Sequence, residues 1–119
     1  MGGGGLGGCR LRRGEIRRYT FRLPDKRRPV LILTHDEVID RLHEIIVVPA
    51  TRTIRGISSE VLLTPGDGIP VACALNFDHV SLAQRDRLGP LLMTLPEPRW
   101  VEVQRALLMA CGSGGGAEG

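Results

Sequence analysis

The apolar residues of this chain occur in short runs separated by turn-forming residues, and this pattern most restricts the possible fold. The longest runs, Val30–Leu33 and Ile45–Val48, have the length of a strand. They are far shorter than the roughly 20 residues that a membrane-spanning helix needs. Unbroken apolar runs of this length, bounded by turn signals, are typical of strands buried in a sheet. We therefore expect a domain built mainly of short strands, with no association with a membrane.

The same pattern predicts the order of the secondary structure elements. A helix is expected over 36–43, and a longer one after Thr94, which stands three residues before Glu97 as in a capping box. Gly112 is expected to end this second helix. Strands are expected over residues 14–22, 29–33, 44–49, 59–64, 70–75, 77–82 and 91–95. These elements favour a mostly β fold with some α: a small antiparallel β-barrel or strongly curved sheet, with the C-terminal helix packed on one side.

The two ends of the chain are too rich in glycine to fold. Eleven of the sixteen glycines lie in residues 1–9 and 112–119. Glycine-rich segments bury too little apolar surface to offset the conformational entropy lost on folding. We therefore expect two flexible tails, 1–9 and 112–119, around a single domain of residues 10–111. About 100 residues are enough for one modest core.

The cysteines and the N-terminus predict a cytoplasmic protein. Cys9, Cys73 and Cys111 are odd in number and widely spaced, which favours neither a disulfide framework nor a zinc site. The N-terminal residues have no apolar segment of the kind found in secretion signals. No group of carboxylates, histidines or cysteines has the spacing of a catalytic metal site. We therefore expect no metal and no other cofactor.

Positive charge is concentrated near the N-terminus. Nine of the sixteen basic residues lie in the nineteen residues from Arg10 to Arg28, although the net charge is only +3. This segment runs into the apolar run that begins at Val30, so its charges are expected on a firmly held surface. A fixed positive surface suits a polyanion, and the commonest one in cells is nucleic acid. Fifteen of the sixteen cations are arginine, which can bind phosphate through two hydrogen bonds.

The order of several short motifs resembles that of a known protein family. None of the motifs is specific alone, but together they extend over residues 12–111, nearly the whole predicted domain. In chain order they are Arg13–Ile16, Arg28–Ile32, Val48–Thr51, Val71–Cys73, Asp78–Val80 and Asp86–Gly89. On these segments the chain is similar to the MazF/PemK toxin endoribonucleases.

This resemblance implies a fold, an activity and partners. The implied fold is a small SH3-like barrel that forms a homodimer. The implied activity is cleavage of single-stranded RNA at short sequence motifs without a metal. A small antitoxin with an acidic, partly disordered segment normally holds such a toxin inactive. The arginine and the hydroxyl residue that the family uses for cleavage fall on Arg28 and Thr51.

The chemistry of these two residue types agrees with the assignment. RNA cleavage by an internal 2′-hydroxyl needs a group that positions or deprotonates this hydroxyl, charge stabilisation of the phosphorane, and a proton for the departing 5′-oxygen. A guanidinium at Arg28 can stabilise the phosphorane and donate a proton, but it is a poor base. The hydroxyl of Thr51 can hydrogen-bond to the phosphate or to the attacking oxygen. Without the family match, an arginine before a proline-led strand is more often a solvated edge charge, and a threonine after proline in a loop is usually a turn former.

Two segments supply further candidates for RNA binding. Arg52, Thr53 and Arg55 lie in the loop after the third expected strand and can follow the RNA backbone. Asp78 and His79 stand where the family commonly has Asp-Gln. Asp78 can hydrogen-bond a base edge or help to hold a dimer. Histidine can act as an acid or a base near neutral pH, although a partly buried polar role also fits His79.

Arg13 and Glu15, near the first expected strand, complete the set of candidates. Arg13 is either a phosphate clamp for the RNA or a solvated charge. Glu15 either accepts a proton or orients Arg28 in the site, or it forms a structural salt bridge. Segment Thr20–Arg27 is shorter than the flexible loop that many relatives use to select the target sequence, so we expect a different target specificity.

Two alternative functions remain open at this level. A non-enzymatic toxin of the same fold binds and poisons DNA gyrase, but such binders do not need the pair formed by Arg28 and Thr51. A non-catalytic RNA-binding module would bind RNA without cutting it. Trp100 is expected to anchor the last helix in the core or in an interface rather than to stack on a base.

Overall fold

The computed structural model describes residues 11–21 and 27–112 of the chain. Both predicted tails lie outside these residues, apart from Gly112. The strands are β2 (Glu15–Thr20), β3 (Arg27–Ile32), β4 (Glu44–Thr51), β5 (Glu60–Leu63), β6 (Cys73–Asn76), β7 (Ser81–Gln84) and β8 (Leu91–Thr94). The helices are α1 (Asp36–Ile39) and α2 (Trp100–Cys111), with 3₁₀ turns η1 (Pro65–Asp67), η2 (Phe77–His79), η3 (Arg85–Arg87) and η4 (Glu97–Arg99).

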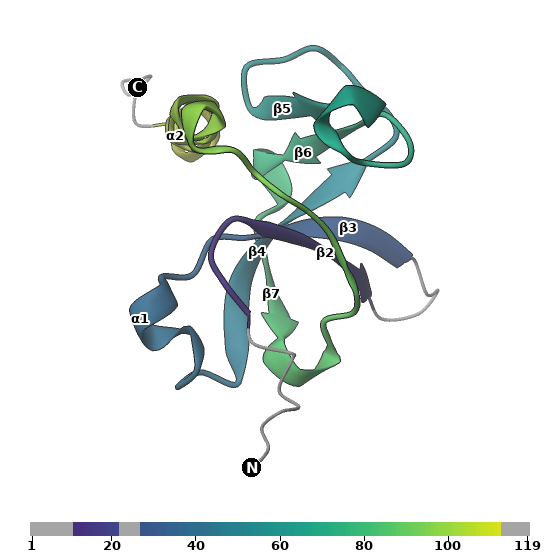
Figure 1. The fold of residues 1–119 in the computed structure, drawn as a ribbon. Helices are drawn as coiled ribbons and strands as arrows, with labels where there is room; N and C mark the ends of the chain where they lie inside the picture. Colours follow the sequence, from purple (N-terminus) through teal and green to yellow (C-terminus); the bar gives the residue numbers. More distant parts are fainter. Residues whose placement is uncertain (1–10, 22–26, 113–119) are drawn as a thin grey trace.

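The strands form one curved antiparallel sheet with a C-terminal helix, which confirms the predicted fold class (Figure 1). The strand order along the main path is β5-β6-β4-β3-β2-β8, and β7 pairs with β4 off this path. Figure 1 shows α2 on the same side of the molecule as β5 and β6, whereas α1 lies at the opposite end. No helix of the described residues is long and apolar enough to cross a membrane.

Strand β4 joins the two parts of the sheet because it changes its partner along its length. Its residues 44–47 pair with β7, and its residues 50–51 pair with β6. Pro49 lies between these two ladders. Proline has no N–H, and at this position neither ladder loses a hydrogen bond. On the other edge Pro49 pairs with Val30 of β3. Strand β4 therefore continues to Thr51, two residues beyond the predicted strand at 44–49.

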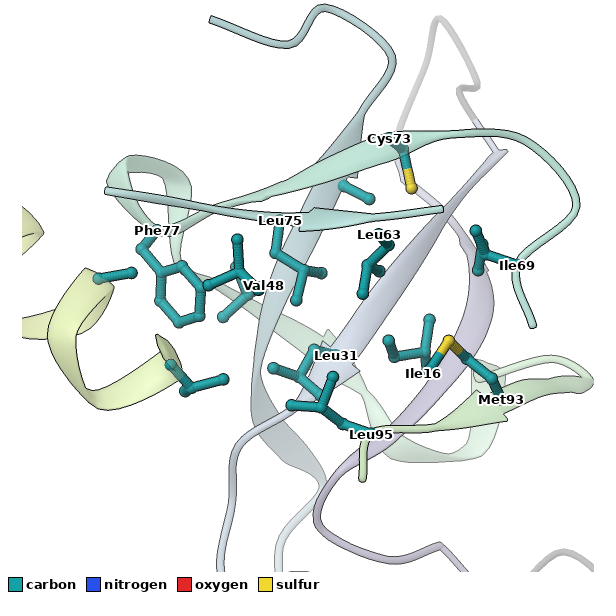
Figure 2. Packing of buried hydrophobic residues seen from close by; sticks show 14 residues of the cluster. Ile16, Leu31, Val48, Leu63, Ile69, Cys73, Leu75, Phe77, Met93 and Leu95 are labelled. Atoms are coloured by element: carbon teal, nitrogen blue, oxygen red, sulfur yellow. The ribbon is translucent and has the colours of Figure 1, made fainter. Parts of the chain in front are cut away.

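The centre of the sheet is buried on both faces. Val30, Leu31 and Ile32 have no exposed surface, as their unbroken apolar run predicts. Because side chains alternate along a strand, Leu31 packs into a cluster that includes residues of α2, whereas Val30 and Ile32 pack into a second cluster. Figure 2 shows the first cluster, with Phe77 beside α2. Burial of each such side chain contributes about 1.5–3 kcal/mol to the stability of the fold. Strands β3 and β4 therefore hold the residues at their ends firmly in place.

Some predicted boundaries were wrong. The helix expected over 36–43 is one turn, Asp36–Ile39, because Leu42 is exposed and Ile39 is its one buried residue. The strands expected over 70–75 and 77–82 begin later, at Cys73 and Ser81. Between them the side chain of Asn76 accepts a hydrogen bond from the Asp78 N–H and so caps η2. This local side-chain acceptor favours the tight turn over a continued strand.

The start of the last helix also differs from the prediction. Glu97–Arg99 form the separate turn η4, with no side-chain cap, so the capping box expected from Thr94 and Glu97 is not formed. Helix α2 begins at Trp100, which packs against the first cluster as predicted. Gly112 ends the helix with φ 72°, in the left-handed region that glycine adopts without steric cost, which confirms that prediction.

Candidate nucleic-acid interface

Arg28 and Thr51 lie at the same end of two paired strands. In the β3–β4 ladder Val30 pairs with Pro49. Arg28 and Thr51 each lie two residues beyond this pair on their strands, and both line the same two hollows, which are described below. Arg28 is also paired with Tyr19 of β2, and Thr51 with Ala74 of β6, so neighbouring strands hold both backbones. Both side chains are half-buried.

A first hollow of about 490 Å³ opens beside this pair. Its walls carry four guanidinium groups on three segments of chain. They belong to Arg18 of β2, Arg27 and Arg28 of β3, and Arg52. An apolar floor is supplied by Ala50, Ile69, Cys73 and Leu92. Cations above an apolar floor can hold a phosphate while the rest of a nucleotide packs below.

A second hollow of about 410 Å³ shares Arg28 and Thr51 with the first. Its apolar side consists of Phe21 and Pro49. The polar side chains of its wall belong to Arg55, Asn76, His79 and Ser81. The two candidate catalytic residues therefore stand where the two hollows meet, and a bound chain can place one nucleotide on each side of them.

The loop after β4 is held at both of its ends. At its start the Thr53 N–H donates to Oγ1 of Thr51 over 3.1 Å. This bond uses an acceptor site of the Thr51 hydroxyl and leaves its hydrogen to donate to a ligand. At its end the N–H groups of Arg55 and Gly56 both donate to Oε1 of Glu60, each over 3.0 Å. These hydrogen bonds hold both ends of the loop, so its exposed residues have defined positions beside the hollows.

Three predicted RNA-binding residues of this loop line the hollows. Arg52 and Thr53 are exposed in the wall of the first hollow, and Arg55 is exposed in the wall of the second. The structure thus brings all three together with Arg28 and Thr51.

The neighbours Asp78 and His79 have different surroundings. His79 is exposed and lines the second hollow, and its carbonyl oxygen accepts a hydrogen bond from the Ser81 hydroxyl over 2.7 Å. Asp78 lines neither hollow. Its Oδ2 accepts a hydrogen bond from the Ser59 hydroxyl over 2.8 Å, which ties η2 to the start of β5. In the described fold His79 therefore lines the hollow that contains Arg28 and Thr51, whereas Asp78 supports its wall.

Arg13 and Glu15 do not lie at the hollows. Ile16 pairs with Leu31 and Tyr19 with Arg28, so Glu15 is at the opposite end of the β2–β3 ladder from Arg28. Arg13 lies over the ring of Trp100, 4.4 Å from its centroid, and its Nε donates to the Leu33 carbonyl over 3.1 Å. These contacts explain Arg13 as a structural cation, and they give no support to the predicted phosphate clamp.

Glu15 belongs to a buried ion pair. Its Oε1 accepts hydrogen bonds from Nε of Arg17 over 2.7 Å and from the Arg12 N–H over 3.2 Å. The side chains of Glu15 and Arg17 are only 10% and 11% exposed. Of the two interpretations that the sequence left open, the structure therefore supports the salt bridge. An orienting contact with Arg28 is contradicted by the position of Glu15 at the other end of the strand.

Cys73 lies in the first hollow, and its side chain is buried. Burial raises the pKa of its thiol, and the charge of Arg52 opposes this effect only in part. The thiol is therefore protonated at neutral pH and acts as part of the apolar floor. Among the described residues no three His, Cys, Asp or Glu side chains are grouped so that they could hold a metal ion.

Sequence reasoning missed several residues of the two hollows. Arg18 and Arg27 belong to the basic segment that pointed to nucleic acid, but only the β2–β3 pairing shows that they face the first hollow. Phe21, Asn76 and Ser81 of the second hollow gave no sequence signal. Phe21 is far from the other two in the chain, and Asn76 and Ser81 flank η2, so only the fold brings the three together.

Comparisons with known proteins agree with this geometry. Residues 12–110 match the family described as PemK-like, MazF-like toxin of type II toxin-antitoxin system. The chain is 36% identical over 103 residues to the probable endoribonuclease MazF2 of Mycobacterium tuberculosis, which covers 86% of this chain and 99% of that protein. It is 53% identical over 55 residues to the probable endoribonuclease MazF5 of the same organism, over 45% of this chain and 50% of that protein.

Solved structures show the same fold. An endoribonuclease from Mycobacterial species, in complex with its cognate antitoxin, superposes with a TM-score of 0.74 at 25% identity and covers 86% of this chain and 95% of that one. The Mycobacterium tuberculosis toxin MazF-mt6 gives 0.71 at 27% identity, over 80% and 95% of the two chains. The matched residues 12–110 include every described strand, and therefore both Arg28 and Thr51.

Proposed function

Because the chain belongs to the PemK-like, MazF-like toxins of type II toxin–antitoxin systems, we propose that it is a toxin that cuts single-stranded RNA. The cuts fall at a short sequence motif, need no metal, and lie mainly in messenger RNA, so that translation and growth stop. The observation that carries this proposal is that Arg28 and Thr51 both line the two hollows and stand where these meet. The named relatives are endoribonucleases, which favours this function over gyrase poisoning and over non-catalytic RNA binding.

The proposed reaction is an attack of the 2′-hydroxyl of the RNA on the adjacent phosphorus. The bond from phosphorus to the 5′-oxygen breaks, and the products carry a 2′,3′-cyclic phosphate and a 5′-hydroxyl. Arg28 holds the phosphate through two N–H donors and stabilises the charge of the phosphorane. Its guanidinium also donates a proton to the departing 5′-oxygen and regains one from solvent water, which takes up the proton that the 2′-hydroxyl loses as it attacks. Thr51 donates its hydroxyl hydrogen to the same phosphate, while the Thr53 N–H occupies one of the two lone pairs of Oγ1.

The remaining hollow residues bind the RNA on either side of the cut. Arg52 and Thr53 contact the backbone at the first hollow, and Arg55 and His79 do so at the second. Phosphate contacts carry most of the affinity, because few aromatic side chains are available for base stacking. Asp78 acts through the wall of the second hollow, which it supports by its bond to Ser59.

The proposed partners are a second copy of the chain and an antitoxin. The solved relative from Mycobacterial species is in complex with its cognate antitoxin. An acidic, partly disordered antitoxin segment would lie along the same guanidinium groups that hold RNA, and so exclude it. A homodimer would bury apolar side chains that the described fold leaves exposed, such as Leu82. The toxin would act in the cytoplasm, where its RNA substrate is found.

The decisive test is a cleavage assay on a long unstructured RNA in the presence of EDTA. The wild-type protein should give discrete cuts, whose mapped ends carry a 5′-hydroxyl. Arg28→Ala and Thr51→Ala should each reduce the cleavage rate by roughly two to three orders of magnitude, because each removes one preorganised transition-state donor.

Matched variants separate chemistry from folding and charge. Thr51→Ser keeps the hydroxyl and should retain most of the activity, and Arg105→Ala removes an exposed cation of α2, away from the hollows, without effect. Folding of each variant is checked by circular dichroism. Full activity of a folded Arg28→Ala protein, or no cuts by the wild type on RNAs of varied sequence, would refute the proposed function.

A further inference from the structure

Asn76 is the most deeply buried polar side chain in the wall of the second hollow. It is 6% exposed, in the last position of β6, yet it lines the hollow that also contains Arg28 and Thr51. Burying an amide costs free energy unless its polar atoms form hydrogen bonds. We therefore expect a buried asparagine in the wall of a hollow to have hydrogen-bond partners there. Nothing in the proposed chemistry uses it.

The amide of Asn76 has a fixed orientation. Its Oδ1 accepts a hydrogen bond from the Asp78 N–H over 3.0 Å, and this N–H can only pair with an oxygen. The acceptor of the amide is therefore engaged in capping η2. The Nδ2 group is the donor of this amide, and the fixed orientation leaves it to donate a hydrogen bond to a molecule in the hollow.

The charges near Asn76 favour a base rather than a phosphate at this point. Glu60 of β5 is paired with Asn76 across the sheet, so a carboxylate lies on the neighbouring strand. One oxygen of Glu60, Oε2, is buried and has no hydrogen-bond partner among the described residues. This carboxylate lies outside the hollow and repels phosphate at Asn76, whereas the guanidinium groups of Arg28 and Arg55 attract phosphate elsewhere in the hollow. Phe21 and Pro49 supply an apolar side against which a base can pack.

We propose that Asn76 is a specificity-determining residue, whose Nδ2 donates to an acceptor atom on the edge of the base in the second hollow. This inference rests on the proposed function. A carbonyl oxygen or an unprotonated ring nitrogen of a base fits such a donor, whereas an amino group in its place would leave two donors facing each other. A site that is built to hydrogen-bond its substrate rejects the analogue that lacks the partner, and thus selects one position of the target motif.

The test measures base preference rather than total activity. The motif of the wild type is mapped first, and kcat/KM is then measured on short RNAs in which each motif position is replaced by every other base. Asn76→Asp keeps the acceptor for the Asp78 N–H and removes the donor, and Asn76→Leu removes the donor without adding a charge. In both variants the preference at one motif position should fall about tenfold, while the preferences elsewhere stay unchanged.

A control variant and a wild-type experiment complete the test. Ser59→Ala removes the other side-chain bond that holds η2. It should change the rates on all RNAs by the same factor, and so leave the ratio of rates between bases intact. In the wild type, an RNA with a 2′-deoxy residue at the cut cannot react, and its binding should shift the NMR signals of the Asn76 side-chain NH₂. The shift should be lost when the base at the selected position is replaced.

The outcomes separate this inference from the proposed function. If the wild type cuts RNA but both Asn76 variants keep its base preference, or lose activity equally at all motif variants, the inference is wrong and the proposed function stands. An unchanged NH₂ signal on binding also overturns it. If the wild type does not cut RNA, the proposed function fails, and the inference is withdrawn with it.

Discussion

At the scale of single residues, a buried ion pair organises the start of β2. Arg17 donates its Nε to Glu15 and its Nη1 to the Gly89 carbonyl over 2.9 Å, so its charge is fully engaged below the surface. Beside this pair Gly14 has φ 94°, and a Cβ there would lie 3.1 Å from the ring of Trp100. The ion pair fixes β2 to the segment at Gly89, and the close approach at Gly14 fixes the contact between the N-terminal segment and α2. Neither feature faces the hollows.

Glu15→Gln should therefore affect stability. The change leaves the Arg17 charge buried without its counter-charge, which we expect to lower the free energy of unfolding by about 3 kcal/mol. Urea unfolding monitored by circular dichroism measures this change. Glu102→Gln is the matched control, because its ion pair with Arg99 leaves the Glu102 side chain 40% exposed and should cost less than about 1 kcal/mol. Unchanged stability with weakened RNA binding would restore the RNA-binding prediction for Glu15.

At the scale of elements, Arg99 fastens the C-terminal helix to the β5 part of the sheet. Its Nη1 donates to Oδ1 of Asp67 over 3.0 Å, its Nη2 donates to the Leu62 carbonyl over 2.7 Å, and its Nε pairs with Glu102. One side chain thus connects η1, β5 and the first turn of α2. The contacts of Arg99 hold the start of α2, where the side-chain cap predicted from the sequence is not formed.

This fastening should make stability depend on pH in acid solution. The Thr64 N–H is the main cause that lowers the pKa of Asp67 below 3.8, and the Thr64 hydroxyl and Arg99 act in the same direction. A lowered pKa in the folded state means that Asp67 stabilises the fold above 3.8 and loses this contribution as the pH falls through its folded value. The contribution should be about 1 kcal/mol, since both partners are partly exposed.

The comparison of wild type with Asp67→Asn measures this contribution. At neutral pH the variant should be less stable by about 1 kcal/mol, and this difference should vanish at a pH well below 3.8. Asp86→Asn, which changes an exposed carboxylate in η3, serves as the control and should leave the acid dependence as it is. A difference between wild type and Asp67→Asn that stays constant with pH would contradict the expectation.

At the scale of the whole molecule, the net charge is only +3, but positive charge is concentrated around the two hollows. Five arginines line the two hollows: Arg18, Arg27, Arg28, Arg52 and Arg55. They come from β2, β3 and the loop after β4, and the curvature of the sheet turns them towards a common region. A single-stranded polyanion that crosses both hollows therefore meets most of this charge.

The affinity for RNA should fall steeply with salt. If each of the five guanidinium groups neutralises one phosphate, the plot of log K against log salt concentration should have a slope of about −3.5. The measurement uses an RNA with a 2′-deoxy residue at the cut. Arg52→Gln and Arg55→Gln should each make the slope shallower by about 0.7, whereas Arg105→Gln on α2 should not change it. A slope near zero would show that phosphate contacts do not dominate binding.

Particular elements show how far the sequence predicts this fold and site. The apolar run at Val30–Leu33 correctly predicts a buried strand, and the family motifs bring Arg28 and Thr51 into the proposed site. The helix expected over 36–43 is only one turn long, because Ile39 is the one residue of this turn that is buried. Arg13 and Glu15 stood near Arg28 in the sequence, yet the antiparallel register moved them to the other end of the ladder.

What the sequence alone determined is the alternation of buried and exposed residues, the position of the turns, and the residue types that chemistry on RNA needs. These depend on local periodicity and on backbone preferences, which act over a few residues. Only the tertiary structure decided which cations converge on the two hollows and that Asn76, with its oriented amide, lies in the wall of one of them. Strand register and sheet curvature depend on pairings between residues far apart in the chain, and a shift of one residue would turn every side chain to the opposite face.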